Sequence, residues 1–137
     1  MSSLLALGAP PARILIVDDE LDNRELLQII LKWEGFLTST ANSGDDALAA
    51  MAKDLPDLVL LDLMMPGLDG CEVTTRMRQN IVTRGIPVLI LSAMDDPAAR
   101  ARVLLAGAAG FILKPIDRAD LCQRVRTLSG RQRTVHS

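Results

Sequence analysis

Aromatic residues, cysteine and histidine are all scarce in this chain of 137 residues. Tyrosine is absent and aromatic residues make up 2% of the sequence, so few rings are available to stack nucleic-acid bases. The two cysteines, Cys71 and Cys122, form no CxxC pair, which argues against a zinc or dithiol site. The only histidine, His136, is the next-to-last residue, so we expect neither a Ser/His/Asp triad nor a histidine metal site.

Excess charge and long apolar runs are missing as well. The formal net charge of −2 gives no general basis for holding DNA or a membrane surface. No apolar run approaches the about 18 residues that span a bilayer, and residues 1–12 lack the basic start of a secretory signal. We therefore expect a cytoplasmic protein that binds neither nucleic acid nor membrane directly.

Apolar residues are plentiful, at 49% of the chain, and the length suits one domain. Short runs rich in Ile, Leu and Val predict strands buried on both faces, and a more alternating run predicts an edge strand. The buried runs are residues 14–17, 58–61, 88–91 and 111–113, and the edge run is residues 36–41. We expect a flexible lead-in at residues 1–12, one domain at 13–128 and a solvated tail at 129–137.

Helical patterns separate these strands. A stripe of Leu26, Ile30 and Trp33, with Leu27 and Leu31 beside them, predicts the apolar face of the first helix, and Gly35 is placed to end it. Ser43 predicts the start of the second helix, and Asp95 or Asp96 before Pro97 that of the fourth. The alternation predicts the α/β class, as a doubly wound five-stranded parallel sheet of order 2-1-3-4-5, the flavodoxin-like (βα)5 arrangement.

A polar side chain follows each of the four buried strands. Asp18 and Asp19 follow the first, and Asp62, Ser92 and Lys114 follow the others. Taken singly, each is typical of a helix cap, a turn or a solvated lysine. Because ligands of open α/β sheets gather beyond the carboxyl ends of the strands, the fold should bring all of these residues together.

Such a set suits phosphoryl transfer. Three neighbouring carboxylates repel one another, and Mg²⁺, which prefers oxygen ligands, would relieve that repulsion. The metal and Lys114 would neutralise phosphoryl oxygens while one carboxylate attacks in line, giving an aspartyl phosphate.

Four segments resemble bacterial response-regulator receiver domains of two-component systems. They are residues 14–20 (ILIVDDE), 56–70 (PDLVLLDLMMPGLDG), 86–93 (IPVLILSA) and 107–115 (GAAGFILKP). The resemblance runs from about Arg13 to Leu128. It implies a phosphorylation switch that is not an enzyme on outside substrates and catalyses only its own phosphorylation and dephosphorylation.

The resemblance also implies a role for each matching residue. Asp62 would be the phospho-acceptor, with Lys114 and Ser92 contacting the phosphoryl group. Asp18, Asp19, Asp62 and the backbone carbonyl of Met64 would hold Mg²⁺. Ser92 and Phe111 would be the switch pair, and the Lys114–Pro115 bond would be cis.

The partners follow from the same resemblance. The phosphoryl donor would be a histidine kinase or a histidine phosphotransfer protein. A downstream effector would bind the face formed by the fourth helix, fifth strand and fifth helix, and the protein would be a monomer or a phosphorylation-dependent dimer.

Two other functions remain open. A flavodoxin-like binding module regulated without phosphate would have no need of the complete set of acids, lysine and hydroxyl. A phosphatase of the haloacid-dehalogenase type would use Asp62 as nucleophile, but residues 62–65 (DLMM) lack the second acid of its DxDx[TV] motif. No GxxxxGK[ST] loop for nucleotide hydrolysis is present.

Overall fold

A computed structural model describes residues 10–134, in which five strands alternate with five helices. His136 and residues 1–9 of the expected lead-in lie outside this range. The elements are β1 (Arg13–Val17), α2 (Leu21–Trp33), β2 (Leu37–Ala41), α3 (Gly44–Lys53), β3 (Leu58–Asp62), α4 (Gly70–Gln79), β4 (Val88–Ser92), α5 (Pro97–Ala106), β5 (Gly110–Leu113) and α6 (Arg118–Thr134).

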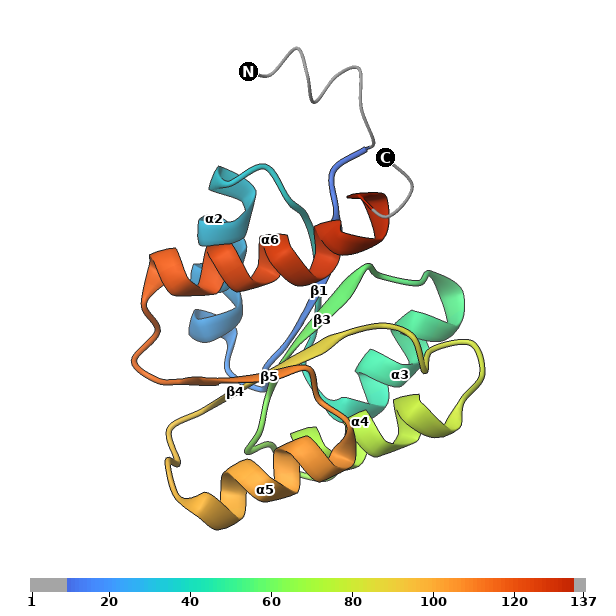
Figure 1. Ribbon diagram of the computed structural model, residues 1–137, viewed down its shortest axis with the longest axis vertical. Helices are drawn as coiled ribbons and strands as arrows, with labels where there is room; N and C mark the ends of the chain where they lie inside the picture. The colour runs from blue at the N-terminus through green and yellow to red at the C-terminus, as the bar shows by residue number, and fades with distance from the viewer. Residues whose placement is uncertain (1–9, 135–137) are drawn as a thin grey trace.

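The five strands form one parallel sheet of order β2-β1-β3-β4-β5, which confirms the predicted topology. Helices α2 and α6 cover one face, and α3, α4 and α5 cover the other (Figure 1). Side chains of the strands alternate between two cores: Leu15 and Val17 face α3, α4 and α5, whereas Ile14 and Ile16 face α2 and α6. Burial on both faces explains why β1, β3 and β4 are continuous apolar runs. The prediction of equal burial for residues 111–113 is wrong, because β5 lies at an edge of the sheet and is only partly buried.

Side chains at the helix starts confirm the predicted caps. The Ser43 hydroxyl accepts a hydrogen bond from the Asp46 amide, and an Asp96 carboxyl oxygen accepts one from the Ala99 amide. Gly35 follows the first helix with φ of +96°, a conformation that side chains disfavour.

The predicted buried stripe of the first helix is wrong in part. Leu27 and Leu31 are the buried residues of α2, Ile30 is partly buried, and Leu26 and Trp33 are 56% and 79% exposed. Because residues 26–33 carry apolar side chains on nearly every side, the pattern alone left the rotation of the helix undetermined, and docking on the sheet fixed it.

Packed structure extends a few residues beyond both expected ends of the domain. Helix α6 continues past Leu128 to Thr134, where we expected a solvated tail. Ser129 is buried, and its hydroxyl donates to the carbonyl of Val125, so it is part of the packed helix. At the other end Ala12 is already buried, and its carbonyl accepts a hydrogen bond from the Leu37 amide.

Candidate functional site

The carboxyl ends of β3, β4 and β5 lie level with one another. In the register of the sheet Asp62 is opposite Leu91, and Ser92 is opposite Leu113. The Lys114 amide donates to the Ser92 carbonyl at 2.8 Å, which carries the alignment one residue beyond β5. Parallel strands in register therefore place the polar residues that follow them at one edge of the sheet.

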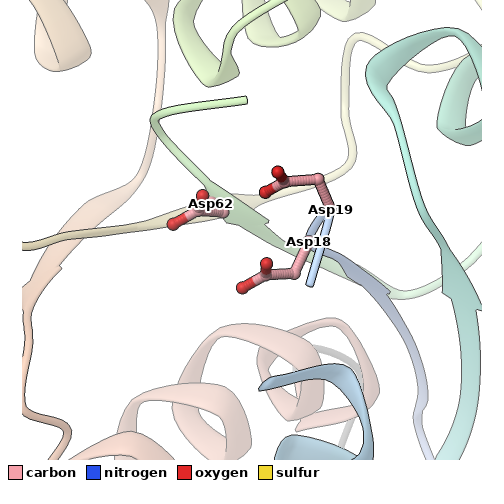
Figure 2. A group of neighbouring side chains, drawn as sticks. All are labelled: Asp18, Asp19 and Asp62. Atoms are coloured by element: carbon pink, nitrogen blue, oxygen red, sulfur yellow. The ribbon is translucent and has the colours of Figure 1, made fainter. Parts of the chain in front are cut away.

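Three aspartates meet at this edge, as the sequence predicted. Asp18 and Asp19 follow β1 and Asp62 ends β3, and one carboxyl oxygen from each lies within 4.8 Å of the others. Figure 2 shows the three side chains next to one another with their carboxyl groups pointing the same way. Asp18 and Asp62 are buried and Asp19 is exposed, so solvent reaches the cluster from one side.

One buried oxygen in this cluster has no hydrogen-bond partner. Asp18 Oδ1 accepts a hydrogen bond from the Glu20 amide at 2.9 Å, whereas Asp18 Oδ2 is buried with none. Arg24 is near in sequence, but its guanidinium donates to the backbone carbonyl of Asp18. A buried carboxylate oxygen without a donor is costly, and a divalent cation would satisfy it. The donor set therefore fits Mg²⁺, because all of its members are oxygens.

Lys114 provides the positive charge at the site. Its ammonium group donates to Asp62 Oδ1 at 2.8 Å. Burial raises the pKa of Asp62, and the charges of Asp18 and Asp19 add to this, outweighing the opposing effect of Lys114. Burial lowers the pKa of Lys114, but the hydrogen bond and charge of Asp62 outweigh it and raise that pKa overall. The lysine therefore stays charged beside the carboxylate.

Two of the expected residues, Ser92 and Phe111, lie on the neighbouring strands β4 and β5. Ser92 is buried at the end of β4, and its hydroxyl accepts a hydrogen bond from the Met94 amide at 2.9 Å. Phe111 lies on β5 opposite Ile90 and is half-buried. The Lys114–Pro115 bond is cis, as the resemblance implied.

The loop after β3 folds back closely over the end of that strand. The Gly70 amide donates to the Leu63 carbonyl at 2.8 Å, and a Cβ at Gly70 would lie 2.8 Å from the Asp62 carbonyl oxygen. The side chain of Met64, in the same loop, is 59% exposed. Metal binding by the Met64 carbonyl stays a prediction.

Sequence patterns did not indicate any role for Arg100. This residue of α5 places its guanidinium carbon 5.0 Å from the centre of the Phe111 ring and is paired with Asp95. Arg100 has no local pattern that would mark it off from Arg102 in the same helix, because the contact depends on how α5 packs against β5.

Comparison with known proteins establishes the family. The response regulator receiver domain pattern matches residues 14–126, within the range 13–128 expected for the domain. The chain belongs to this family and is a receiver domain of the two-component type. No helix within residues 10–134 is long and apolar enough to cross a membrane.

Two curated relatives are longer than this chain. The response regulator PleD of Caulobacter vibrioides is 47% identical over 118 residues, which are 86% of this chain but 26% of PleD. The DNA-binding response regulator MtrA of Mycobacterium tuberculosis is 41% identical over 114 residues, 83% of this chain and 49% of MtrA. The chain thus spans about a quarter to a half of these relatives.

Solved structures agree with the fold. A response regulator from Chloroflexus aurantiacus is 36% identical with a TM-score of 0.84, covering 88% of this chain and 99% of that one. The receiver domain of the sensor histidine kinase PA1611 from Pseudomonas aeruginosa is 27% identical with a TM-score of 0.81, covering 88% and 98%. That structure has a magnesium ion coordinated in its active-site cleft.

Proposed function

We propose that Asp62 accepts a phosphoryl group from a histidine kinase or a histidine phosphotransfer protein in a Mg²⁺-dependent reaction. Asp18, Asp19, Asp62 and the backbone carbonyl of Met64 would hold the metal. The observation that carries this proposal is the unpartnered Asp18 Oδ2 beside two further carboxylates and the ammonium group of Lys114. Membership of the receiver family supports it independently.

The chemistry at Asp62 is a displacement at phosphorus. A carboxylate oxygen of Asp62 forms a bond to phosphorus while the bond from phosphorus to the donor's imidazole nitrogen breaks, and that nitrogen keeps the electron pair. Bound Mg²⁺ would supply positive charge for the phosphoryl oxygens. Lys114, already hydrogen-bonded to Asp62, supplies the second charge. Ser92 would donate its hydroxyl proton to a phosphoryl oxygen. No outside substrate is turned over, so the chain is not proposed as an enzyme in that sense.

Intact mass spectrometry tests the acceptor. Wild-type protein incubated with phosphoramidate and Mg²⁺ should gain one phosphoryl group that hydroxylamine removes, and Asp62→Asn should gain none. Chelating the metal should stop the labelling of wild type, because the carboxylate cluster then repels the anionic donor. Equal labelling of wild type and Asp62→Asn would refute the assignment of Asp62.

We further propose how the signal leaves the site. When Ser92 turns toward the phosphoryl group, the Phe111 ring would move into the space it vacates and change the surface formed by α5, β5 and α6. A downstream effector, or a second copy in a phosphorylation-dependent dimer, would recognise that surface. Adding beryllofluoride should shift NMR signals of Phe111 and of residues 98–106. Shifts confined to the surroundings of Asp62 would contradict this mechanism.

The compartment and the direct partners complete the proposal. Cys71 and Cys122 are both buried free thiols, which suits the reducing cytoplasm. Direct binding of DNA or membrane by this domain is not proposed, because its net charge is −2. MtrA is DNA-binding as a whole protein, and the present chain matches about half of it.

A further inference from the structure

A guanidinium group covers the outward side of the Phe111 ring. The Arg100 guanidinium carbon lies 5.0 Å from the ring centre, within the range of a cation–π contact. Arg100 itself is exposed, and Phe111 is half-buried where it packs against the core beneath α5. Helix α5 leads into β5 (Figure 1), and the two elements are in contact. The ring therefore has apolar contacts on its inner side and a cation on its outer side.

Arg100 is also attached to the segment that leaves Ser92. Its Nε donates to Asp95 Oδ1 at 2.7 Å, and its Nη2 lies 2.6 Å from the same oxygen. Asp95 follows Ser92 by three residues, and the Met94 amide between them donates to the Ser92 hydroxyl. A continuous set of contacts thus runs from Ser92 through Asp95 and Arg100 to Phe111.

We propose that Arg100 is a positioning residue that holds the Phe111 ring outward in the unphosphorylated protein and so sets the resting balance of the switch. This inference rests on the proposed function, because it takes Phe111 as the ring that moves on phosphorylation. Asp95 fixes the guanidinium over the ring, and the two residues act as one unit.

The contact favours only one position of the ring. Phe111 already packs against the cluster that contains Val103 and Ala108, and the charged, hydrated guanidinium could not follow the ring further into such apolar surroundings without losing solvation. A group that interacts with one of two states shifts their ratio by its differential interaction. At an exposed site a cation–π contact changes that ratio by about two- to fivefold.

Ring-labelled phenylalanine gives a direct measurement. Phe36 and Phe111 are the only phenylalanines, so protein grown with ring-¹³C-phenylalanine has two sets of ring signals, and buried Phe36 on the opposite face serves as the internal reference. Without phosphate, Arg100→Gln should move the Phe111 signals part of the way toward their beryllofluoride positions and leave Phe36 unchanged. Arg100→Lys, which keeps the cation, should restore much of the wild-type position.

The affinity for beryllofluoride gives a second measurement. The effect expected of Arg100→Gln is opposite in sign to the effect of losing a positive charge alone. If the inward ring belongs to the state that binds the anion, removing the outward restraint should tighten binding by about two- to fivefold. Loss of a positive charge alone would instead weaken binding of an anion. Arg102→Gln is the matched control: it removes the same charge from α5, but Arg102 pairs with Asp69 and not with the ring. It should not tighten binding.

The outcomes separate this inference from the proposed function. If wild-type Phe111 signals do not move with beryllofluoride, the switching proposal itself fails. If they do move, but Arg100→Gln leaves both the resting ring signals and the affinity as in wild type, only the role of Arg100 is overturned. That role is likewise overturned if Arg102→Gln tightens binding as much as Arg100→Gln.

Discussion

Replacing Asp62 with asparagine should stabilise the metal-free protein, although it removes the proposed phospho-acceptor. Asp62 is 6% exposed and shares its surroundings with Asp18 and Asp19, so its carboxylate is charged in an unfavourable place. Burial, followed by these two charges, raises its pKa above the ordinary value of 3.8 despite Lys114. Asparagine keeps the shape and an oxygen for Lys114 but carries no charge.

The size of the effect follows from the opposing interactions. At an effective dielectric of about 20, Asp18 at 4.8 Å or less repels Asp62 by at least about 3.5 kcal/mol, and Lys114 at 2.8 Å attracts it by about 6 kcal/mol. Asp19 is exposed, so its repulsion is nearer the about 1 kcal/mol of bulk water. Burying a carboxylate costs several kcal/mol, and this cost together with the two repulsions slightly exceeds the attraction to Lys114. The net penalty on the charged form of Asp62 is on the order of 1 kcal/mol. Asp62→Asn should raise Tm by about 3–5 °C.

Added Mg²⁺ should make wild type more stable than Asp62→Asn, the reverse of the order expected without metal. At tenfold excess over its Kd, a ligand that binds only the folded protein stabilises it by about 1.4 kcal/mol. Wild type, with all three carboxylates, should gain this amount, whereas Asp62→Asn has lost a ligand and should gain much less. Thermal unfolding in chelator and in a Mg²⁺ series measures both effects. Asp45→Asn, which removes an exposed carboxylate in the first turn of α3, is the control and should respond to Mg²⁺ like wild type.

The stability difference between the two proteins should also depend on pH. Since the folded pKa of Asp62 lies above 3.8, the penalty is fully present above the folded pKa and is relieved as the pH falls toward 3.8. The advantage of metal-free Asp62→Asn over wild type should therefore shrink in that window. A metal-free variant less stable than wild type at neutral pH, or equal stabilisation of both proteins by Mg²⁺, would refute the reasoning.

Two further predictions concern the surroundings of the site, and a third concerns the opposite edge of the sheet, where β4 and β5 begin. Met64 follows Asp62 by two residues, and Met94 follows Ser92 by two. Because a thioether is only a weak acceptor for the attacking water, we expect a long-lived phosphorylated state. The double variant Met64→Asn, Met94→Glu should lose phosphate about tenfold faster, as followed by intact mass. Gly70→Ala should lower the free energy of unfolding by about 1–3 kcal/mol in urea titrations, because its Cβ would press on the backbone of Asp62 at 2.8 Å. Arg78→Met should cost about 2–4 kcal/mol in the same assay, because the Arg78 guanidinium donates to the carbonyls of Thr83, Arg84, Ile86 and Gly107.

The sequence by itself determined the order of the elements and the topology of the sheet. Apolar runs of four residues can be buried strands only if both faces are covered, and right-handed crossovers leave few ways to connect them. The same logic located the aspartate cluster, because residues that follow parallel strands must share an edge. Asp18, Asp19, Asp62 and Lys114 are indeed together there.

Only the tertiary structure decided how each helix is rotated, where α6 ends and which contacts surround the switch residues. Leu27 rather than Leu26 is buried because of how α2 docks against the sheet, and Ser129 is part of α6, where it is buried and its hydroxyl donates to the Val125 carbonyl. The contact of Arg100 with Phe111 joins residues on different elements, and no local pattern encodes it. Local sequence thus specifies the type of each helix or strand and its place along the chain. Contacts between elements depend on packing that only the folded chain defines.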